Sequence, residues 1–459
     1  MRGERLPEDR GPSALTRREF LIRLGGVAAG ATSLAMASPA TLLRAGSQAP
    51  PASTFDAVVA TAWFDLALTL VRDTPGFSPP VASRAFAYMG VTLYEALEPA
   101  MPGYRTLAGQ LNDFRLPAGP SNGAFHWPTV ANAALASTLR RIFPTAPSER
   151  RADLDALERG FAEEFQESVS PQILRRSVAR GRSMARHIYR WSRGDGGHEA
   201  YLTNFPEYTL PVGPGFWVST PPGFLPALQP YWGSNRPFVL AEGARCNPGP
   251  PPEYSEKPSS AFEAEARECY EITTNLTADQ EAIAHFWSDD PVRTATPSGH
   301  WVSILTQVIE SHVRLDVAAE AYAKVGMAVA DAFISCWHTK YRYNLLRPVT
   351  YIQHVVDPAW IPLLVTPPFP EYTSGHSVQS AAAAQVLTQM FGQVAFTDHS
   401  HDDRGLAPRS FDSFFEAAEE AALSRLYGGI HFRSAIVKGL DQGRCVGRHV
   451  SRLRFQLGD

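Results

Sequence analysis

Apolar residues recur at helical spacing through most of this chain of 459 residues. A half-buried strand needs apolar and polar residues in alternation, and such alternation is nearly absent, as are hairpin turns. The spacing predicts helices over residues 54–72, 80–98, 128–143, 148–167, 171–193, 259–273, 277–288, 300–340, 375–391, 411–426 and 432–454. The predicted fold class is therefore all-α, with the helices arranged as paired bundles.

A proline-rich stretch interrupts the helical pattern. Residues 201–260 hold 13 of the 38 prolines, with many Gly and aromatic residues and little periodicity. Such a composition predicts a long irregular crossover. The chain then divides into an N-terminal helical region at residues 50–200, the crossover at 201–258 and a C-terminal helical bundle at 259–459.

The N-terminus has the features of an export signal. Residues 16–21 read TRREFL, and a mildly apolar stretch with a small-residue site at 35–37 follows. This arrangement resembles a twin-arginine export signal over residues 1–45, which predicts a folded protein that is periplasmic or secreted. No later apolar run is long enough to span a membrane, so we expect no stable span in the mature chain.

Charge and cysteine composition exclude two kinds of site. Lys and Arg number 42 against 46 Asp and Glu, and without a basic excess we expect no nucleic-acid partner. The four Cys form no CxxC and no cluster with His, so no zinc site is predicted and the pairing of any disulfide stays open. Only four basic residues are Lys, which makes Lys340 within a motif informative.

Three short segments of the last third carry the polar side chains with catalytic potential. They are residues 340–348, 369–376 and 424–431. The first segment holds Lys340 and Arg347, which are seven residues apart and are expected on one face of a helix that Pro348 ends or bends.

The other two segments add hydrogen-bond donors and imidazoles. Ser374 and Gly375 precede an Ala-rich helix, where free backbone N–H groups can face an anion, and His376 follows them. In the third segment a Gly-Gly pair lets the chain turn tightly, which would bring Arg425 and His431 to one point. Three cations, a hydroxyl, a Gly N–H and two imidazoles suit a tetrahedral oxyanion that passes to a five-coordinate state.

In this order, the segments resemble the superfamily shared by vanadium-dependent haloperoxidases and type 2 phosphatidic acid phosphatases. The family pattern is K-x6-RP, then PSGH, then SR-x5-H-x3-D. This chain departs from it twice, because Thr373 replaces the Pro and Ala435 replaces the final Asp. The Asp would orient the histidine, so another acceptor is expected, with Asp398, Asp402 and Asp403 as candidates.

The resemblance implies roles for individual residues. His431 would be the covalent ligand of vanadium, or the nucleophile of a phosphatase, and His376 would be the acid–base group. Lys340 is also expected to take part in catalysis. The residues implied to bind the vanadate cofactor are Lys340, Arg347, Ser374, Gly375, Arg425 and His431.

Flanking residues favour one chemistry over the other. Trp337 and Phe369 match aromatic positions that line a halide pocket in the family, and about 200 residues precede the motifs beyond what a minimal phosphatase needs. The predicted function is a vanadate-dependent haloperoxidase that oxidises halide with hydrogen peroxide to a hypohalous-acid equivalent, with a small organic acceptor as a further partner. The alternatives are an exported acid phosphatase with a phosphohistidine intermediate and a non-catalytic oxyanion-binding protein, which the Ala435 departure suggests. A homo-oligomer remains open.

Other polar groups receive ordinary interpretations. Residues 297–300 read PSGH but precede the first segment, so Pro297 to Gly299 are interpreted as a turn that opens the next helix, with His300 at the helix start. His285, Asp289, Asp290 and His300 fit no standard metal spacing and are interpreted as a solvated helix end. Residues 398–403, DHSHDD, are interpreted as a polar loop, with calcium as the ion to expect if they bind one.

Overall fold

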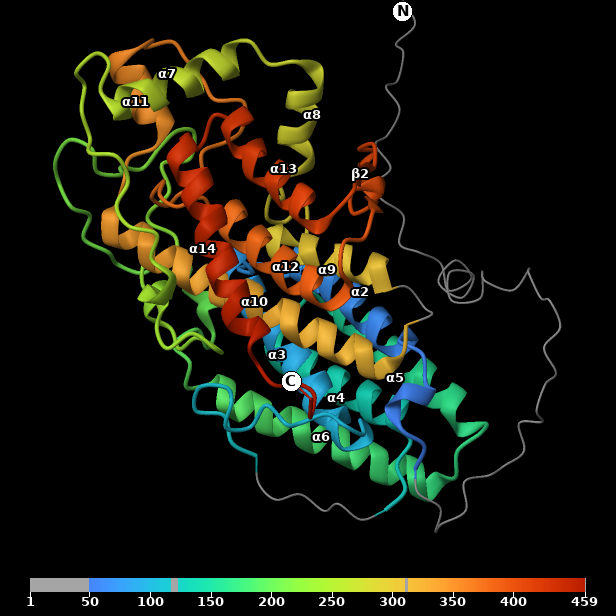
Figure 1. The fold of residues 1–459 in the computed structure, drawn as a ribbon. Helices are drawn as coiled ribbons and strands as arrows, with labels where there is room; N and C mark the ends of the chain where they lie inside the picture. The colour runs from blue at the N-terminus through green and yellow to red at the C-terminus, as the bar shows by residue number, and fades with distance from the viewer. Residues whose placement is uncertain (1–48, 117–122, 310–312, 459) are drawn as a thin grey trace, which may run out of the picture. The chain divides into compact units, whose positions relative to one another are not determined.

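The computed structural model describes residues 49–116, 123–309 and 313–458, and the regular secondary structure of these residues is almost all helix (Figure 1). Two compact units divide the chain, Met1–Thr41 and Leu42–Asp459, and all the described residues belong to the second. The predicted export signal at residues 1–45 lies outside them. No helix among the described residues is long and apolar enough to cross a membrane.

The helices fall before and after the proline-rich crossover. Those before it are α2 (Val58–Asp73), α3 (Pro79–Leu97), α4 (Trp127–Ile142), α5 (Ser148–Gln166) and α6 (Pro171–Ser192). Those after it are α7 (Ala261–Thr274), α8 (Ala278–Phe286), α9 (Thr296–Ile309), α10 (Leu315–Tyr343), α11 (Pro348–Val355), α12 (Gly375–Phe391), α13 (Phe414–Tyr427) and α14 (Arg433–Ser451). Short 3-10 turns are η1 (Ala52–Thr54), η2 (Glu98–Ala100), η3 (Ala200–Leu202), η4 (Trp232–Ser234), η5 (Gly243–Cys246) and η6 (Asp402–Arg404). The two strands β1 (Phe396–Asp398) and β2 (Arg409–Phe411) pair antiparallel.

The all-α prediction is confirmed, and helix starts follow the sequence signals. Thr277 caps α8, and its side chain and that of Gln280 form a complete capping box. Two expectations were wrong in detail. Residues 300–340 are not one stretch, because the chain at Arg314 is extended and pairs with Asp56. The short helix α11 was not predicted, although Pro348 occupies its first turn, where Pro is favoured.

Helix α10 connects the two halves of the fold. It packs against α3 from the first half and against α12 and α14 from the second (Figure 1). The crossing with α3 is close because glycines face backbone on both sides. A Cβ on Gly90 would lie 2.4 Å from the Tyr322 carbonyl oxygen, and one on Gly326 would lie 2.9 Å from the Ala87 Cα. Any larger side chain at either position would force the two helices apart.

A second close crossing joins α12 to α14. Gly439 and Gly443 lie one turn apart on α14, and both face α12. A Cβ on Gly443 would lie 2.1 Å from the Val378 carbonyl oxygen, and one on Gly439 would lie 2.7 Å from the Ser377 Cβ. This contact fixes the N-terminal turn of α12 against α14, where two of the sequence segments meet.

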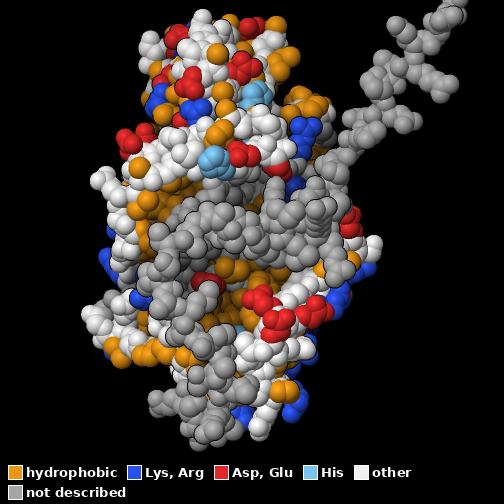
Figure 2. All heavy atoms as spheres, turned by 90° about the vertical axis from the view of Figure 1, so that its right-hand side faces the viewer, with side chains coloured by type: hydrophobic (Ala, Val, Ile, Leu, Met, Phe, Trp, Pro, Cys, Tyr) orange, Lys and Arg blue, Asp and Glu red, His pale blue; other side chains and the backbone are white. Residues whose placement is uncertain are grey.

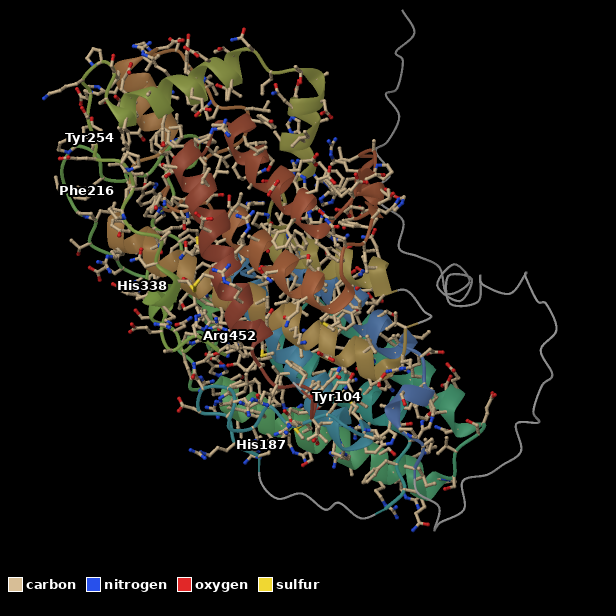
Figure 3. All side chains as sticks on the ribbon, in the orientation of Figure 1. Tyr104, His187, Phe216, Tyr254, His338 and Arg452 are labelled. Atoms are coloured by element: carbon tan, nitrogen blue, oxygen red, sulfur yellow. A yellow bond between two sulfur atoms is a disulfide. The ribbon has the colours of Figure 1, made fainter. Side chains whose placement is uncertain are left out.

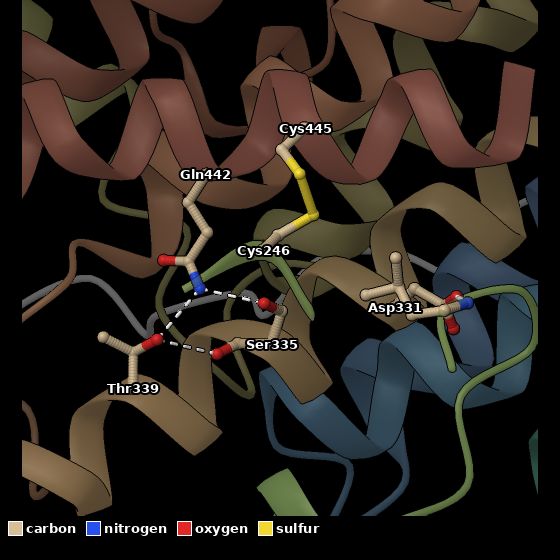
Figure 4. The surroundings of a disulfide bond; sticks show 7 residues. Cys246, Asp331, Ser335, Thr339, Gln442 and Cys445 are labelled. Carbon is tan, nitrogen blue, oxygen red and sulfur yellow. Dashed lines mark hydrogen bonds between the residues drawn. A yellow bond between two sulfur atoms is a disulfide. The ribbon is translucent and has the colours of Figure 1, made fainter. Parts of the chain in front are cut away.

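The crossover lies along α10 and is fixed to it by polar contacts. Asp331 of α10 is fully buried and accepts hydrogen bonds from the N–H groups of Phe238, Val239 and Leu240 at 2.6–3.0 Å. Cys246 forms a disulfide with Cys445 of α14 (Figure 4). These bonds replace the regular structure that the proline-rich sequence does not form.

The outer part of the crossover also follows the site-bearing end of α10. Phe216 pairs with Leu345 just beyond the end of the helix, and Gly215 packs on the Tyr254 ring (Figure 3). Gly233 and Gly243 lie against His338.

A different face, turned to the viewer in Figure 2, carries hydrophobic side chains beside acidic ones at the surface.

We expect loss of the disulfide to destabilise the fold without changing its helices. The bond closes a loop of 199 residues between the crossover and α14, so the double variant Cys246→Ser/Cys445→Ser should lose about 2–5 kcal/mol of unfolding free energy. Urea unfolding followed by circular dichroism measures the change. Reductant should bring the wild-type midpoint to that of the variant, and a wild-type midpoint indifferent to reductant would contradict the expectation.

Candidate active site

The second and third sequence segments line one cavity of about 510 Å³, and Lys340 and Arg347 of the first segment donate hydrogen bonds to these two segments. The walls of the cavity come from the crossover, the loop before α9, the end of α10, the loop before α12 and the loop after α13. His376, Arg425 and His431 line it together with Gly375. The site is therefore assembled by tertiary packing from helix ends that are far apart in sequence.

The first segment reaches the site differently from the prediction. Lys340 lies in the last turn of α10, but Asn344 adopts a left-handed conformation and ends the helix. Arg347 is the residue before α11 and has extended backbone. The two cations therefore do not share a helix face, and the expectation of a common face was wrong because the helix ends between them.

Lys340 is fully buried and holds the second segment. Its ammonium group donates hydrogen bonds to the Pro370 and Glu371 carbonyl oxygens at 2.8 and 2.9 Å. Burial lowers the pKa of Lys340 to about 7, and Arg347 adds to the lowering. An ammonium group has three N–H donors, so two of them fix the loop that precedes α12.

Arg347 is also fully buried, and part of its guanidinium has no protein partner. Nε donates to the Phe369 carbonyl at 2.8 Å and Nη1 to the Ile430 carbonyl at 2.7 Å. Nη2 is buried without a hydrogen bond to any of the described residues. Because an unpaired buried charge is costly, this Nη2 is the strongest indication in the site of a missing anionic partner.

Arg425 completes the set of buried cations. It lies in the last turn of α13, and its Nε donates to the Ser424 hydroxyl at 3.0 Å. Nη2 donates to the Ala284 carbonyl at 3.2 Å. Burial lowers the pKa of Arg425 to about 10, so it remains charged at neutral pH.

Ser374 and Gly375 form the start of α12, as the sequence predicts. The Ser374 hydroxyl caps the helix by accepting the Ser377 N–H at 3.3 Å. Its own hydrogen is left to donate, and the Gly375 N–H lies in the first turn, where the helix offers no acceptor. Both donors therefore suit the binding of an anion.

His431 is oriented by a carboxylate that the sequence analysis did not single out. The Nδ1 atom of His431 lies 2.8 Å from Glu371 Oε1, and the Phe432 N–H donates to the same oxygen at 2.9 Å. Glu371 is fully buried. It is the only acidic residue in the three segments, which is the signal that could have identified it.

The three aspartates considered for this role do not take it. Asp398 contacts His300, Asp402 contacts the exposed His399, and Asp403 forms an ion pair with Arg72. The reason is their position on the β1–β2 hairpin and its loop, away from Glu371. Ala435 is buried, and its carbonyl accepts the Ser374 N–H at 3.1 Å.

These contacts define the protonation of His431. Arg347 Nη1 lies 3.2 Å from Nε2 of His431, and because a guanidinium can only donate, Nε2 carries a lone pair and Nδ1 carries the hydrogen. Burial, with Arg347, Lys340 and Arg425, holds the pKa of His431 well below its usual range. The ring is therefore neutral, and its unprotonated Nε2 atom accepts from Arg347 at the edge of the cavity.

The Glu371 carboxyl is the counter-charge to this group of cations. Burial raises the pKa of Glu371, while Lys340 and Arg347 oppose the rise. Its Oε1 atom accepts two hydrogen bonds, which favours the ionised form. A single buried carboxylate beside Lys340, Arg347 and Arg425 leaves an excess of positive charge in the site.

Thr373, at the departure from the family Pro, has a structural role of its own. Its hydroxyl donates to Gln442 Oε1 of α14 at 2.6 Å. The Gln442 amide in turn donates to the hydroxyl groups of Ser335 and Thr339 on α10 at 2.9 and 3.0 Å (Figure 4). One amide thus joins the loop before α12 to both neighbouring helices.

His376 follows Gly375 in the first turn of α12 and faces the cavity. Burial lowers its pKa to about 4, and Arg425 adds to the lowering. Its Nε2 atom lies 3.6 Å from Asp289 Oδ2. The imidazole is therefore neutral near pH 7 and free to accept a proton.

Trp337 and Phe369 lie on one wall of the same cavity. Their ring centroids are 5.0 Å apart, and the Trp337 Nε1–H donates to the Leu228 carbonyl at 3.2 Å. The Phe369 ring also lies beneath two of the buried cations, 5.0 Å from Lys340 Nζ and 4.9 Å from Arg347 Cζ. These aromatic rings exclude water from one side of the site.

Two interpretations of polar groups as ordinary surface were wrong. Asp289 and His300 are buried, as are Asp398 and His401. Residues 297–299 belong to the start of α9 and not to a turn before it, and His300 has one nitrogen 3.0 Å from Asp289 and the other 2.7 Å from Asp398. Spacing could not reveal this cluster because the loop before α9 and strand β1 converge only in the folded chain. His285 is exposed, as expected.

The residues present fit a small tetrahedral oxyanion. Three features favour an anion beside Nε2 of His431. They are the excess of buried cations, the unpaired Nη2 of Arg347 and the N–H groups at the start of α12. A cation would be repelled from this position. The donor set therefore agrees with the chemistry that the sequence segments suggest.

Comparisons with known proteins agree with this geometry. Residues 320–457 match the family model described as the VCPO second helical-bundle domain. The solved structure of the first bacterial vanadium-dependent iodoperoxidase is 38% identical, covers 88% of this chain and 97% of its own, and has a TM-score of 0.80.

Two other structures share the fold at lower identity. A holo-type bacterial vanadium-dependent chloroperoxidase is 17% identical, with 83% of this chain and 93% of its own chain covered and a TM-score of 0.65. The apo-type structure of a bacterial vanadium-dependent chloroperoxidase is 16% identical, with 83% of this chain and 94% of its own chain covered and a TM-score of 0.61. No curated protein sequence matches the chain. The identity and coverage of the iodoperoxidase show that this chain belongs to the vanadium-dependent haloperoxidase family.

Proposed function

We propose that the protein is a vanadate-dependent haloperoxidase that oxidises halide with hydrogen peroxide. One observation carries the proposal. Lys340, Arg347 and Arg425 form a buried cluster near Nε2 of His431, and only one carboxylate in the three segments, that of Glu371, offsets their positive charge. The likeness to an iodoperoxidase over most of both chains supports the same chemistry and makes iodide the first halide to test.

Vanadate would be held by the residues that the cavity brings together. Nε2 of His431 would bind the vanadium, while Lys340, Arg347 and Arg425 would neutralise its oxygens. The Ser374 hydroxyl and the Gly375 N–H would donate hydrogen bonds. Bound vanadate supplies a Lewis-acidic centre that activates hydrogen peroxide toward halide.

Glu371 would make His431 a better ligand. Its carboxylate accepts the Nδ1 hydrogen, which fixes the tautomer with the lone pair on Nε2 and raises the basicity of the ring. Because Glu371 is in the segment that Lys340 holds by two carbonyl oxygens, ligand orientation depends on that buried ammonium group. This arrangement removes the reason to suppose a relaxed, non-catalytic site.

His376 would handle the proton. A neutral imidazole beside the cavity can act as a general base that accepts a proton from entering peroxide. The resulting imidazolium can then act as a general acid that donates the proton to a departing hydroxyl group. Trp337 and Phe369 would give the halide an apolar wall and keep water away.

The mouth of the cavity would receive the organic acceptor. Several lining side chains there are apolar and exposed, including Phe224, Val292 and Val365 at 63%, 74% and 70%. An apolar rim attracts a small aromatic or unsaturated molecule. We also propose export by the twin-arginine route, to the periplasm or beyond, on the motif at residues 16–21 and the small-residue site at 35–37.

The direct test is halogenation of a phenolic dye by the purified chain with hydrogen peroxide and iodide or bromide. We expect turnover only after orthovanadate is added, and His431→Ala should abolish vanadate retention while His376→Ala lowers turnover more than binding. Phosphomonoester hydrolysis that vanadate inhibits, with no halogenation, would replace the proposal by a phosphatase.

Glu371→Gln should weaken vanadate binding by about 10- to 100-fold, because an amide accepts the Nδ1 hydrogen without the negative charge. Equilibrium dialysis against orthovanadate measures the dissociation constant. Glu268→Gln is the matched control, since Glu268 pairs with Arg433 outside the cavity. Equal affinities in Glu371→Gln and wild type would contradict the orienting role.

Lys340→Arg should impair vanadate binding and turnover although the charge is kept. Lys340 is fully buried, and a guanidinium is too large to replace an ammonium between two carbonyl oxygens. Arg342→Lys on the exposed side of the same helix is the control. Unchanged affinity and turnover in Lys340→Arg would reduce Lys340 to a generic cation.

A further inference from the structure

Asp289, in the loop between α8 and α9, faces three imidazole rings at the edge of the cavity. His300 Nδ1 lies 3.0 Å from both of its carboxylate oxygens. His401 Nε2 lies 3.3 Å from Oδ1, and His376 Nε2 lies 3.6 Å from Oδ2. Asp289 is 2% exposed, so none of these separations is filled by bulk water.

His300 lies behind Asp289 and is held on every side. Its Nε2 atom is 2.7 Å from Asp398 Oδ2, and its ring stacks on Trp287 at 4.3 Å. Asp398 is fully buried at the end of β1, where the Ser400 N–H donates to its other oxygen at 2.9 Å. The carboxylates of Asp289 and Asp398 thus lie at opposite nitrogens of one buried ring.

This arrangement settles the charge of the ring. A neutral imidazole has one N–H and could satisfy only one of the two carboxylates, whereas an imidazolium donates to both. Although burial opposes the charge, Asp289 and Asp398 together raise the pKa of His300 to about 10. The row of charges running away from His376 is therefore negative, positive, negative.

We propose that Asp289, His300 and Asp398 form a positioning relay that aims the Asp289 carboxylate at His376 and sets the proton affinity of that imidazole. His300 and Asp398 act through Asp289 and do not touch the cavity centre. The relay rests on the proposed function only for the acid–base role of His376. His300 belongs to the PSGH sequence at 297–300 and Asp398 to the DHSHDD sequence at 398–403, so both sequences contribute a residue to the relay.

Other charged groups act on His376 as well, and they decide the sign of the effect. Arg425 from α13 and His300 from α9 disfavour its protonation, while Asp289 favours it. His431 lines the same cavity and interacts electrostatically with His376, and Asp290 acts on Arg425. Asp289 is the nearest carboxylate, so the relay works against a mostly cationic surrounding.

The relay makes two single-charge changes act in opposite directions. Asp289→Asn removes the carboxylate beside His376, so its pKa should fall by about one unit or more. Asp398→Asn leaves His300 with a single carboxylate and a neutral amide, so His300 should lose its proton. The positive charge of His300 then disappears together with the negative charge of Asp398, which is farther from His376. The pKa of His376 should therefore rise by roughly a few tenths of a unit.

The experiment is a histidine NMR titration of the full chain, loaded with orthovanadate and again without it. The His376 resonance is assigned as the one that His376→Gln removes. Because the titration needs no turnover, its result does not depend on the haloperoxidase activity. Asp402→Asn is the matched control, since Asp402 is exposed and its carboxylate contacts His399 in the same loop; it should leave the pKa of His376 unchanged.

A second variant guards against misfolding. His300→Gln should raise the pKa of His376 as Asp398→Asn does, because it too removes the positive charge, and circular dichroism confirms the fold of each variant. Downward shifts in Asp289→Asn, Asp398→Asn and His300→Gln alike would overturn the relay. Stoichiometric zinc in the purified chain, lost in Asp289→Asn, would also overturn it, because His300 would then be a neutral metal ligand.

Discussion

Positive charge that is buried in excess of its counter-charge is the constraint on which the site depends. Lys340, Arg347 and Arg425 are almost completely removed from water, and Glu371, which contacts His431, is the carboxylate beside them. Such a cluster is unfavourable unless an anion binds there, so the surrounding helices must hold the cations together against their repulsion. All three cations meet this requirement by donating to main-chain carbonyls of other segments.

Close helix packing supplies the rigidity that this cluster needs. The crossing of α12 with α14 places backbone against backbone, and Gln442 joins α14, α10 and the loop before α12 by hydrogen bonds. The N-terminal half contributes through α3, whose glycine meets α10 directly. The crossover, fixed to α10 through Asp331, then closes the apolar side of the cavity. The added length of the chain thus forms walls around a site that the C-terminal helices assemble.

The sequence was sufficient for the fold class, because helical periodicity is a local property, and for the residues that gather at the cavity, because their order in three segments is distinctive. It was not sufficient for contacts between residues that no spacing relates. Glu371 meets His431 across 60 residues and His300 meets Asp398 across 98. Whether Asp289 is solvated or buried also depends on packing, and no pattern in the loop before α9 records that. The end of α10 at Asn344 was missed for a related reason, since the left-handed turn there is one residue long.

The carboxylate that contacts His431 comes from a different segment of the chain from the one that the family pattern specifies. An acid four residues after the histidine would lie in the first turn of α14, just beyond His431, whereas Glu371 comes from the loop that precedes Ser374 and His376. Ala435 is then free to remain small, and its backbone rather than its side chain contacts that loop. A sequence pattern that demands the helical acid will overlook chains built in this way, although they keep an imidazole–carboxylate pair in the fold.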